Sequence, residues 1–114
     1  MAIQVLEFSG VATSNPLDTS AGTANTGTAA SSGSITPAGS GELLVGMLAG
    51  HANAQTMTVS SAGFTVQSQQ NSTGTIASVR TGYQVLTGTG AISFDGSFGT
   101  GMYWAAGIVA FKHQ

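Results

Sequence analysis

The sequence predicts an all-β protein, an antiparallel sandwich or barrel of about six to eight strands. Three observations support this prediction. No segment carries an apolar stripe with the 3.6-residue period of a helix for more than about two turns. Gly, Ser, Thr and Val recur along the whole chain, and they favour turns and strands over helices. Several segments alternate apolar and polar residues with the two-residue period of a strand.

Turn signals divide the chain into eight candidate strands. Each is a short run rich in β-branched, aromatic or aliphatic residues, bounded by residues such as Gly, Pro, Asn and Ser. The candidates are Ile3–Phe8, Ala30–Ile35, Glu42–His51, Gln55–Ser60, Phe64–Gln69, Ile76–Thr87, Ala91–Phe94 and Met102–Lys112.

The stretch Ser14–Ser40 is rich in Ser, Thr, Ala, Asn and Gly, which predicts a loop followed by an edge strand. Within it, Asn15-Pro16-Leu17-Asp18 has the composition of a turn, because Pro fixes φ at a turn position. We expect Leu17 to pack against the core and Asp18 to accept hydrogen bonds from backbone N–H groups. The glycine-rich runs Gly22–Gly27 and Gly88–Gly101 lack the lysine of a phosphate-binding loop, so they are interpreted as turns.

Two candidate strands are apolar at both odd and even positions. They are Glu42–Gly50 and Met102–Phe111. A strand of this kind is covered on both faces, whereas a small sandwich normally leaves one face in water. The second face therefore needs a cover, either a partner subunit or a further piece of the same chain. Ile76–Thr87 alternates instead, which predicts that Ala77, Val79, Tyr83 and Val85 face the core while Ser78, Arg80 and Gln84 face water.

The order of these motifs resembles the C-terminal half of a β-rich module that recurs in large secreted and surface proteins of bacteria. The resemblance covers nearly the whole chain and implies a jelly-roll-like sandwich whose N-terminal half is absent here. It brings no catalytic motif, and it implies that two identical halves could pair through an isologous interface. The residues that carry it are Val5–Gly10, Asn15–Asp18, Ser34–Pro37, Gly41–Gly46, Ala62–Phe64 and Trp104–Phe111.

Composition limits what the protein can do. With 114 residues and 41% hydrophobic residues, residues 1–114 form one domain with one core, unless they are half of a larger module. Charged residues make up 5% of the chain, against about 25% in an ordinary soluble domain. Two cations, Arg80 and Lys112, cannot build a nucleic-acid groove. No apolar run reaches the ~18 residues of a membrane span.

The same composition predicts an extracellular or cell-surface location. Ser and Thr supply about a quarter of the residues, and Cys is absent, so neither a disulfide nor a thiolate contributes. The start, Met1–Phe8, has the composition of a strand rather than of a signal peptide. We therefore expect a mature portion or an excised piece, with a complete gene product as the alternative.

Few residues could carry chemistry. The two histidines, His51 and His113, do not stand at a metal-ligand spacing from each other or from the acids Glu7, Asp18, Glu42 and Asp95. No Gly-x-Ser-x-Gly nucleophile elbow is present. We therefore predict no catalytic residue, no metal and no cofactor.

The aromatic residues offer one candidate binding site. Carbohydrate sites combine an exposed aromatic ring with nearby polar groups, and the candidates are Phe98, Tyr103 and Trp104. Tyr103 and Trp104 are neighbours and so face opposite ways on a strand. Phe98 stands in a glycine-rich segment and is expected to be the exposed aromatic.

Three functional hypotheses remain at this point. The first is a non-catalytic structural or adhesive module that associates with copies of itself as a dimer or higher oligomer. The alternative is a carbohydrate-binding module with a glycan partner. The third is a small hydrolase that uses His51.

Overall fold

The protein is all-β, with one antiparallel sheet. The computed structural model describes residues 1–51, 55–74 and 77–114, and within them it contains seven strands and no helix. The strands are β1 (Leu17–Ser31), β2 (Leu43–His51), β3 (Met57–Val59), β4 (Thr65–Val66), β5 (Gln70–Asn71), β6 (Ala77–Val85) and β7 (Asp95–Phe111). Their order is β1-β7-β2-β6-β4, with β3 on β7 and β5 on β6. The predicted all-β antiparallel class is confirmed, and the strand count falls within the expected range.

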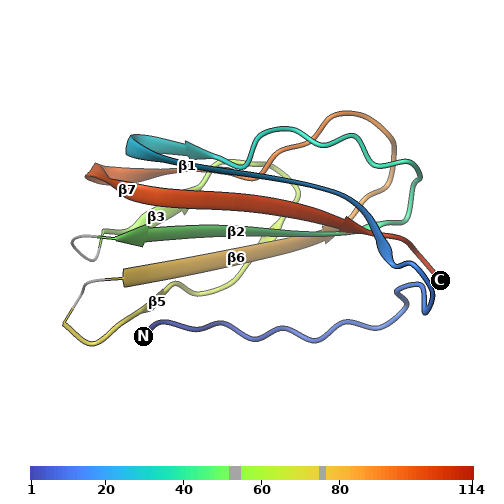
Figure 1. The fold of residues 1–114 in the computed structure, drawn as a ribbon, viewed down its shortest axis with the longest axis horizontal. Helices are drawn as coiled ribbons and strands as arrows, with labels where there is room; N and C mark the ends of the chain where they lie inside the picture. Colours follow the sequence, from blue (N-terminus) through green and yellow to red (C-terminus); the bar gives the residue numbers. More distant parts are fainter. Residues whose placement is uncertain (52–54, 75–76) are drawn as a thin grey trace.

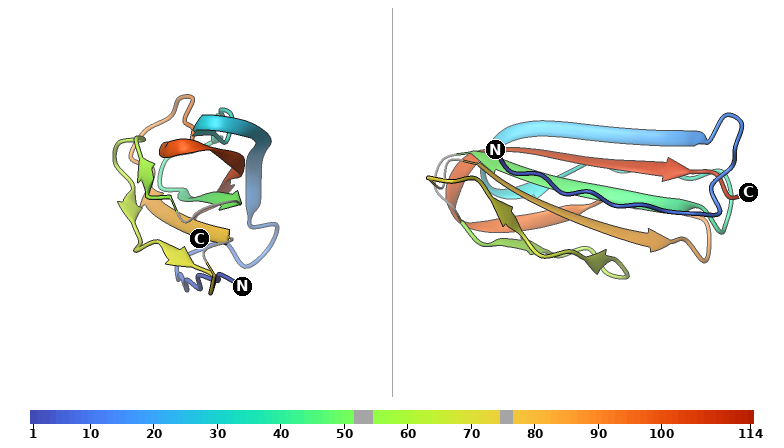
Figure 2. Two further views of the ribbon diagram at one scale, coloured as in Figure 1. Left: turned by 90° about the vertical axis from the view of Figure 1, so that its left-hand side faces the viewer. Right: turned by 90° about the horizontal axis from the view of Figure 1, so that it is seen from below.

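The sheet curls because its longest strand changes partners. The second part of β7, from residue 103 onward, lies between β1 and β2. Its first part, from Asp95 to Phe98, pairs with β3 and with the end of β1. A register shift between Gly27 and Ala29 of β1 separates the two parts. The first part of β7 consequently turns across the sheet. The strands are labelled in Figure 1, and the end-on view in Figure 2 shows this turn.

The core lies inside this curl. Burial alternates along β7, so that every second side chain from Met102 to Ala110 faces inward. On β2 the inward side chains are Leu44 and Leu48. The buried core residues are Ala30, Ile35, Leu44, Leu48, Met57, Phe94, Phe98, Met102, Trp104, Ala106, Ile108 and Ala110.

Phe94 is fixed in a slot made by two glycines. Gly46 and Gly82 face each other across β2 and β6, and the Phe94 ring lies on both of them. A Cβ atom on Gly82 would come within 2.9 Å of Phe94 Cε2, and one on Gly46 would overlap the Phe94 ring. Phe64 packs edge-on against Phe94 with ring centroids 4.9 Å apart. The hydroxyl of buried Ser32 accepts a hydrogen bond from the Phe94 backbone N–H at 2.8 Å.

This slot also decides which face of β6 is inside. Because Gly82 must face Phe94, Ser78, Arg80 and Gln84 face inward with it. Arg80 is satisfied there: its Nε donates to Gln67 O at 3.0 Å and its Nη1 donates to Met57 O at 2.6 Å. The prediction that the apolar side chains of this strand face the core is therefore wrong. Ala77, Val79, Tyr83 and Val85 face outward instead.

The predicted strand Ile3–Phe8 is also absent. Residues 1–8, here called the arm, run extended along the outer face of β6 without forming a strand (Figure 2). Both edges of β6 are already paired, with β2 on one side and with β4 and β5 on the other. The arm is held by side chains instead, with Gln4 bonded to Ser68 O and to Thr81 Oγ1, and Phe8 packed against Tyr83.

The low-complexity stretch Ser14–Ser40 contains the other large difference. Its composition predicts a loop followed by an edge strand, whereas residues 17–31 form the single fifteen-residue strand β1, which does lie at an edge of the sheet. The small polar side chains over most of this range do not predict a strand. The strand forms because its backbone pairs with that of β7. Leu17 is exposed, contrary to expectation, whereas Asp18 does accept a hydrogen bond from Ala38 N at 2.9 Å.

The remaining predicted strands divide into two groups. Strands lie within Glu42–His51, Gln55–Ser60, Phe64–Gln69 and Ile76–Thr87, and β7 includes most of Met102–Lys112; Ile76 itself lies outside the described residues. Ala30–Ile35 and Ala91–Phe94 contain no strand of their own apart from the end of β1, and they are joined by the isolated bridge between Ile35 and Ile92 and by hydrogen bonds between Ser32 and Phe94. The glycine-rich run Gly88–Gly101 is only partly a turn, because β7 begins at Asp95.

Candidate functional site

The three aromatic residues proposed for a glycan do not share a surface. Tyr103 is 66% exposed on the outer face, whereas Trp104 is buried on the inner face, as neighbours on a strand must be. Phe98 is only 5% exposed, so the prediction that it is the exposed aromatic is wrong. Phe98 faces the core where β7 pairs with Met57 of β3. The glycine-rich sequence around Phe98 did not indicate this burial.

The most unusual surface is the outer face of the sheet beside the arm. We call the outer side chains of β2, β7 and β1 the outer strip. They form registered rows across the three strands. The rows are His51–Tyr103–Thr26, Ala49–Ala105–Ala24, Met47–Gly107–Gly22 and Val45–Val109–Ser20, ending at Leu43–Phe111–Leu17.

The outer strip is mainly apolar, and several of its side chains are accessible. Met47 is 41% exposed, and Tyr103, Ala105 and Leu17 are exposed as well. None of its side chains belongs to Asp, Glu, Lys or Arg. The predicted two-sided apolar character of β2 and β7 is thus present, and the arm covers only the neighbouring strand β6.

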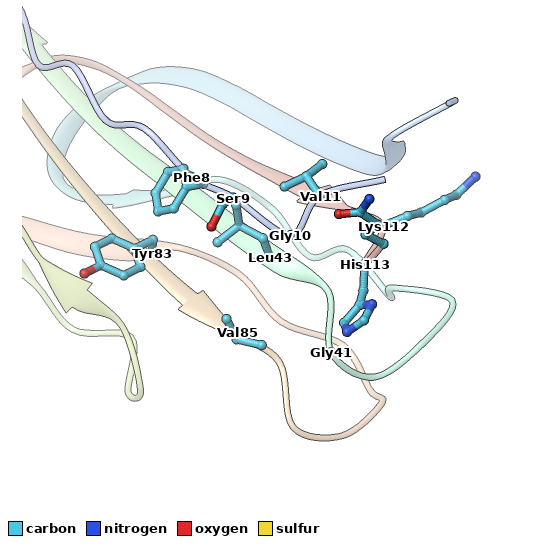
Figure 3. Close-up of a pocket in the computed structure, with 11 residues that line it drawn as sticks. Phe8, Ser9, Gly10, Val11, Gly41, Leu43, Tyr83, Val85, Lys112 and His113 are labelled. Atoms are coloured by element: carbon cyan, nitrogen blue, oxygen red, sulfur yellow. The ribbon is translucent and has the colours of Figure 1, made fainter. Parts of the chain in front are cut away.

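Two larger hollows lie near the two ends of the arm, and a smaller one of about 220 Å³ lies along its middle, lined by Ile3, Gln4, Val5, Leu6, Gln67 and Gln70. The first, of about 430 Å³, lies next to Ala2 and is lined by Met47, His51, Tyr103 and Ala105 among others. The second, of about 410 Å³, lies where the arm ends, and its lining includes Phe8, Tyr83, Val85 and His113 (Figure 3). In Figure 3 the rings of Phe8 and Tyr83 lie on one side of this hollow, and the Lys112 side chain extends away from it. Both larger hollows are mainly apolar.

The titratable groups do not converge on either hollow. His51 ends β2 beside Tyr103, whereas His113 lies at the opposite end of the sheet in a bridge with Val11. The lining of the hollow beside His51 includes no carboxylate. Across residues 1–51, 55–74 and 77–114, no three His, Asp or Glu side chains are grouped closely enough to hold a metal ion.

One carboxyl group is buried. Glu42 is 4% exposed; its Oε1 accepts a hydrogen bond from Gly39 N at 3.0 Å, and its Oε2 has no hydrogen-bond partner among the described residues. Burial raises the pKa of Glu42 above its ordinary value of 4.5, and the negative charge of Asp18 raises it further. The Gly39 hydrogen bond and the charge of Lys112 oppose this shift.

Glu42 should therefore make the fold less stable as the pH rises. The folded state holds its proton more tightly than the unfolded chain, so the contribution is fully present below pH 4.5 and is lost as the pH rises through the higher folded pKa. We expect Glu42→Gln to raise the melting temperature at pH 7.5 and to change it little at pH 4, with wild type and variant compared at one protein concentration. A variant that melts below the wild type at pH 7.5, or keeps its pH dependence, would contradict this assignment.

No protein-family model, no curated protein and no solved structure matches this chain. Among the described residues, no helix has the length and apolar character needed to cross a membrane.

Proposed function

We propose that this protein is a non-catalytic structural or adhesive module that works outside the cell by associating with copies of itself. The observation that carries the proposal is the outer strip, a mainly apolar surface without Asp, Glu, Lys or Arg on strands whose inner face already packs the core. Three strands of nine residues cover about 14 Å by 30 Å, or roughly 400 Å², from ordinary strand spacings. A patch of roughly this size is about the largest that a typical soluble monomer exposes, and such patches are often binding sites.

The composition favours a second copy as the partner. A surface without charged side chains meets no like-charge repulsion when it packs against itself, and it offers no charge pattern to select a different protein. The near absence of Lys, Arg, Asp and Glu elsewhere also fits a module that works outside the cell, where hydroxyl groups provide solubility.

Self-association predicts that stability depends on protein concentration. Burial of the outer strip in an assembly stabilises the folded chain by mass action, so the melting temperature should rise over a series from low to high micromolar protein. A melting temperature that stays constant over this series would contradict the proposal.

Carbohydrate binding is a second candidate, supported by the exposed ring of Tyr103 beside the hollow lined by His51 and Ser78. Trp104 is the single tryptophan and contributes to the lining of this hollow, so its fluorescence is the probe for a bound oligosaccharide. Self-association as the function predicts no saturable fluorescence change when oligosaccharides are titrated. A saturable change that Tyr103→Ala removes and Tyr83→Ala keeps would favour the glycan hypothesis.

A further inference from the structure

The arm stands above the rest of the outer face, and this shape suits contact with a second copy. Its alternate side chains Ala2, Gln4, Leu6 and Phe8 are half-buried towards β6. The other set faces away from the sheet, with Ile3 64% and Val5 85% exposed. The end-on view in Figure 2 shows the arm on the side of β6 away from the core. The outer face is therefore a raised apolar arm next to a bare apolar strip.

We propose that two copies interlock face to face, with the arm of each lying over β7 of the other. This inference rests on the proposed self-association and specifies its geometry. The contact is isologous, so each copy contributes both an arm and an outer strip. Ile3 and Val5, which are largely exposed in one copy, become covered by the partner.

Symmetry selects this arrangement. When two outer faces meet, their two-fold axis lies in the plane between them. An axis perpendicular to the strands, centred on the arm, would place arm against arm and hold the two strips apart. An axis parallel to the strands and above β2 exchanges the positions of β6 and β7, because these two strands flank β2. The arm above β6 of one copy then falls on β7 of the other.

The same symmetry sets which residues meet. An axis parallel to the strands keeps each residue at its level along the sheet. Gln4 is fixed at the level of Thr81 by a 2.8 Å hydrogen bond, and Thr81 is in register with Met47 and Gly107. Ile3 of one copy therefore lies over the stretch from Ala105 to Gly107 of the partner.

The side chains at these levels fit the contact. Ala105 and Gly107 on β7, with Ala24 and Gly22 beside them on β1, are the smallest on the outer strip and leave room for Ile3 and Val5. Met47 lies on the axis strand, where it can fill the space between the two arms.

Charge and area agree with the same geometry. Glu7 is the acidic residue of the arm, and the same register brings it towards the end of β7, next to the exposed Lys112 of the partner. A face four strands wide and nine residues long covers about 570 Å² per copy, or about 1,100 Å² in total, from ordinary strand spacings. A specific interface needs about 1,000 Å² or more.

A charge-complementation experiment tests the interlock. Ile3→Glu and Ala105→Lys change exposed positions, so each variant should fold, which circular dichroism checks. Each homodimer would bury two unpaired charges, and we expect the dissociation constant to rise about 100-fold or more. A mixture of the two variants should recover a heterodimer, because the carboxylate introduced on the arm of one copy meets the ammonium group introduced on β7 of the other. Thr58→Glu, exposed on β3, is the matched control and should assemble normally.

The outcomes separate this inference from the proposal beneath it. Loss of assembly in both single variants, with recovery on mixing, supports the interlock. A wild-type protein that assembles while Ile3→Glu assembles equally well, or a mixture that stays monomeric, overturns the interlock and leaves self-association standing. A wild-type protein that remains monomeric overturns both.

Discussion

Replacing Phe94 with alanine should lower the free energy of unfolding by about 3–5 kcal/mol, which is a large part of a domain's net stability of roughly 5–15 kcal/mol. Phe94 is fully buried, and its ring fills the slot over Gly46 and Gly82, so the shortened side chain leaves a cavity that the sheet cannot close. Urea denaturation followed by Trp104 fluorescence measures the loss. Phe64→Ala, at the half-buried neighbour, should lose less.

The opposite change at the same place should also destabilise the fold. Gly46→Ala adds a methyl group where the Phe94 ring already lies, and overpacking of this kind costs about 1–3 kcal/mol. Gly101→Ala is the control, because Gly101 also lies in a strand and its added Cβ would have no neighbouring atom within 4 Å. The wild type and the four variants should be compared at one protein concentration, since assembly itself contributes to stability. Equal losses in Gly46→Ala and Gly101→Ala would show that the slot is not tight.

A pair of neighbouring aspartate substitutions should give opposite phenotypes. Leu48 is fully buried on the inner face, so Leu48→Asp places an unpaired charge in the core and should abolish folding. Met47 is the preceding residue and faces outward, so Met47→Asp should leave a folded chain that no longer assembles. Circular dichroism reports the fold and sedimentation velocity reports the assembly, with Met47→Leu as the conservative control.

The pair separates packing from association because both changes lie on one strand and introduce the same charge. Two folded and assembled variants would mean that the faces of β2 are assigned wrongly. A Met47→Asp variant that fails to fold would mean that the outer strip is part of the core of one chain rather than a surface.

The sequence predicts the central strands well because their signals are local. The continuous apolar runs of β2 and β7 indicate strands that need cover on two faces, and the structure shows one face in the core and the other exposed. Small residues such as Gly46 point to close packing, although only the fold shows that Phe94 is what packs there.

The errors arise where long-range pairing overrides local preference. The polar stretch of β1 becomes a strand because β7 supplies its backbone hydrogen-bond partners. These partners are distant in the sequence, so the local sequence of β1 does not indicate them. The face of β6 is reversed for a similar reason: Gly82 must meet Phe94, so polar Ser78 and Arg80 turn inward with it. Ile3–Phe8 has the alternation of a strand but lies against β6, whose two edges are already paired, and becomes the arm.

The candidate site was predictable only in outline. Apolar residues on both faces of β2 and β7 indicated that a surface needs cover, and adjacency indicated that one of Tyr103 and Trp104 points outward. The alignment of small residues from β2, β7 and β1 into one strip depends on the register of three strands that are distant in sequence. That register is a property of the fold.

The mass of the protein in solution is the decisive quantity. Sedimentation equilibrium of the wild-type chain from low to high micromolar concentration should give twice the 11.3 kDa of one chain, with dissociation towards the lower concentrations. A single species of 11.3 kDa across the whole range, with a concentration-independent melting temperature, would contradict self-association through the outer face.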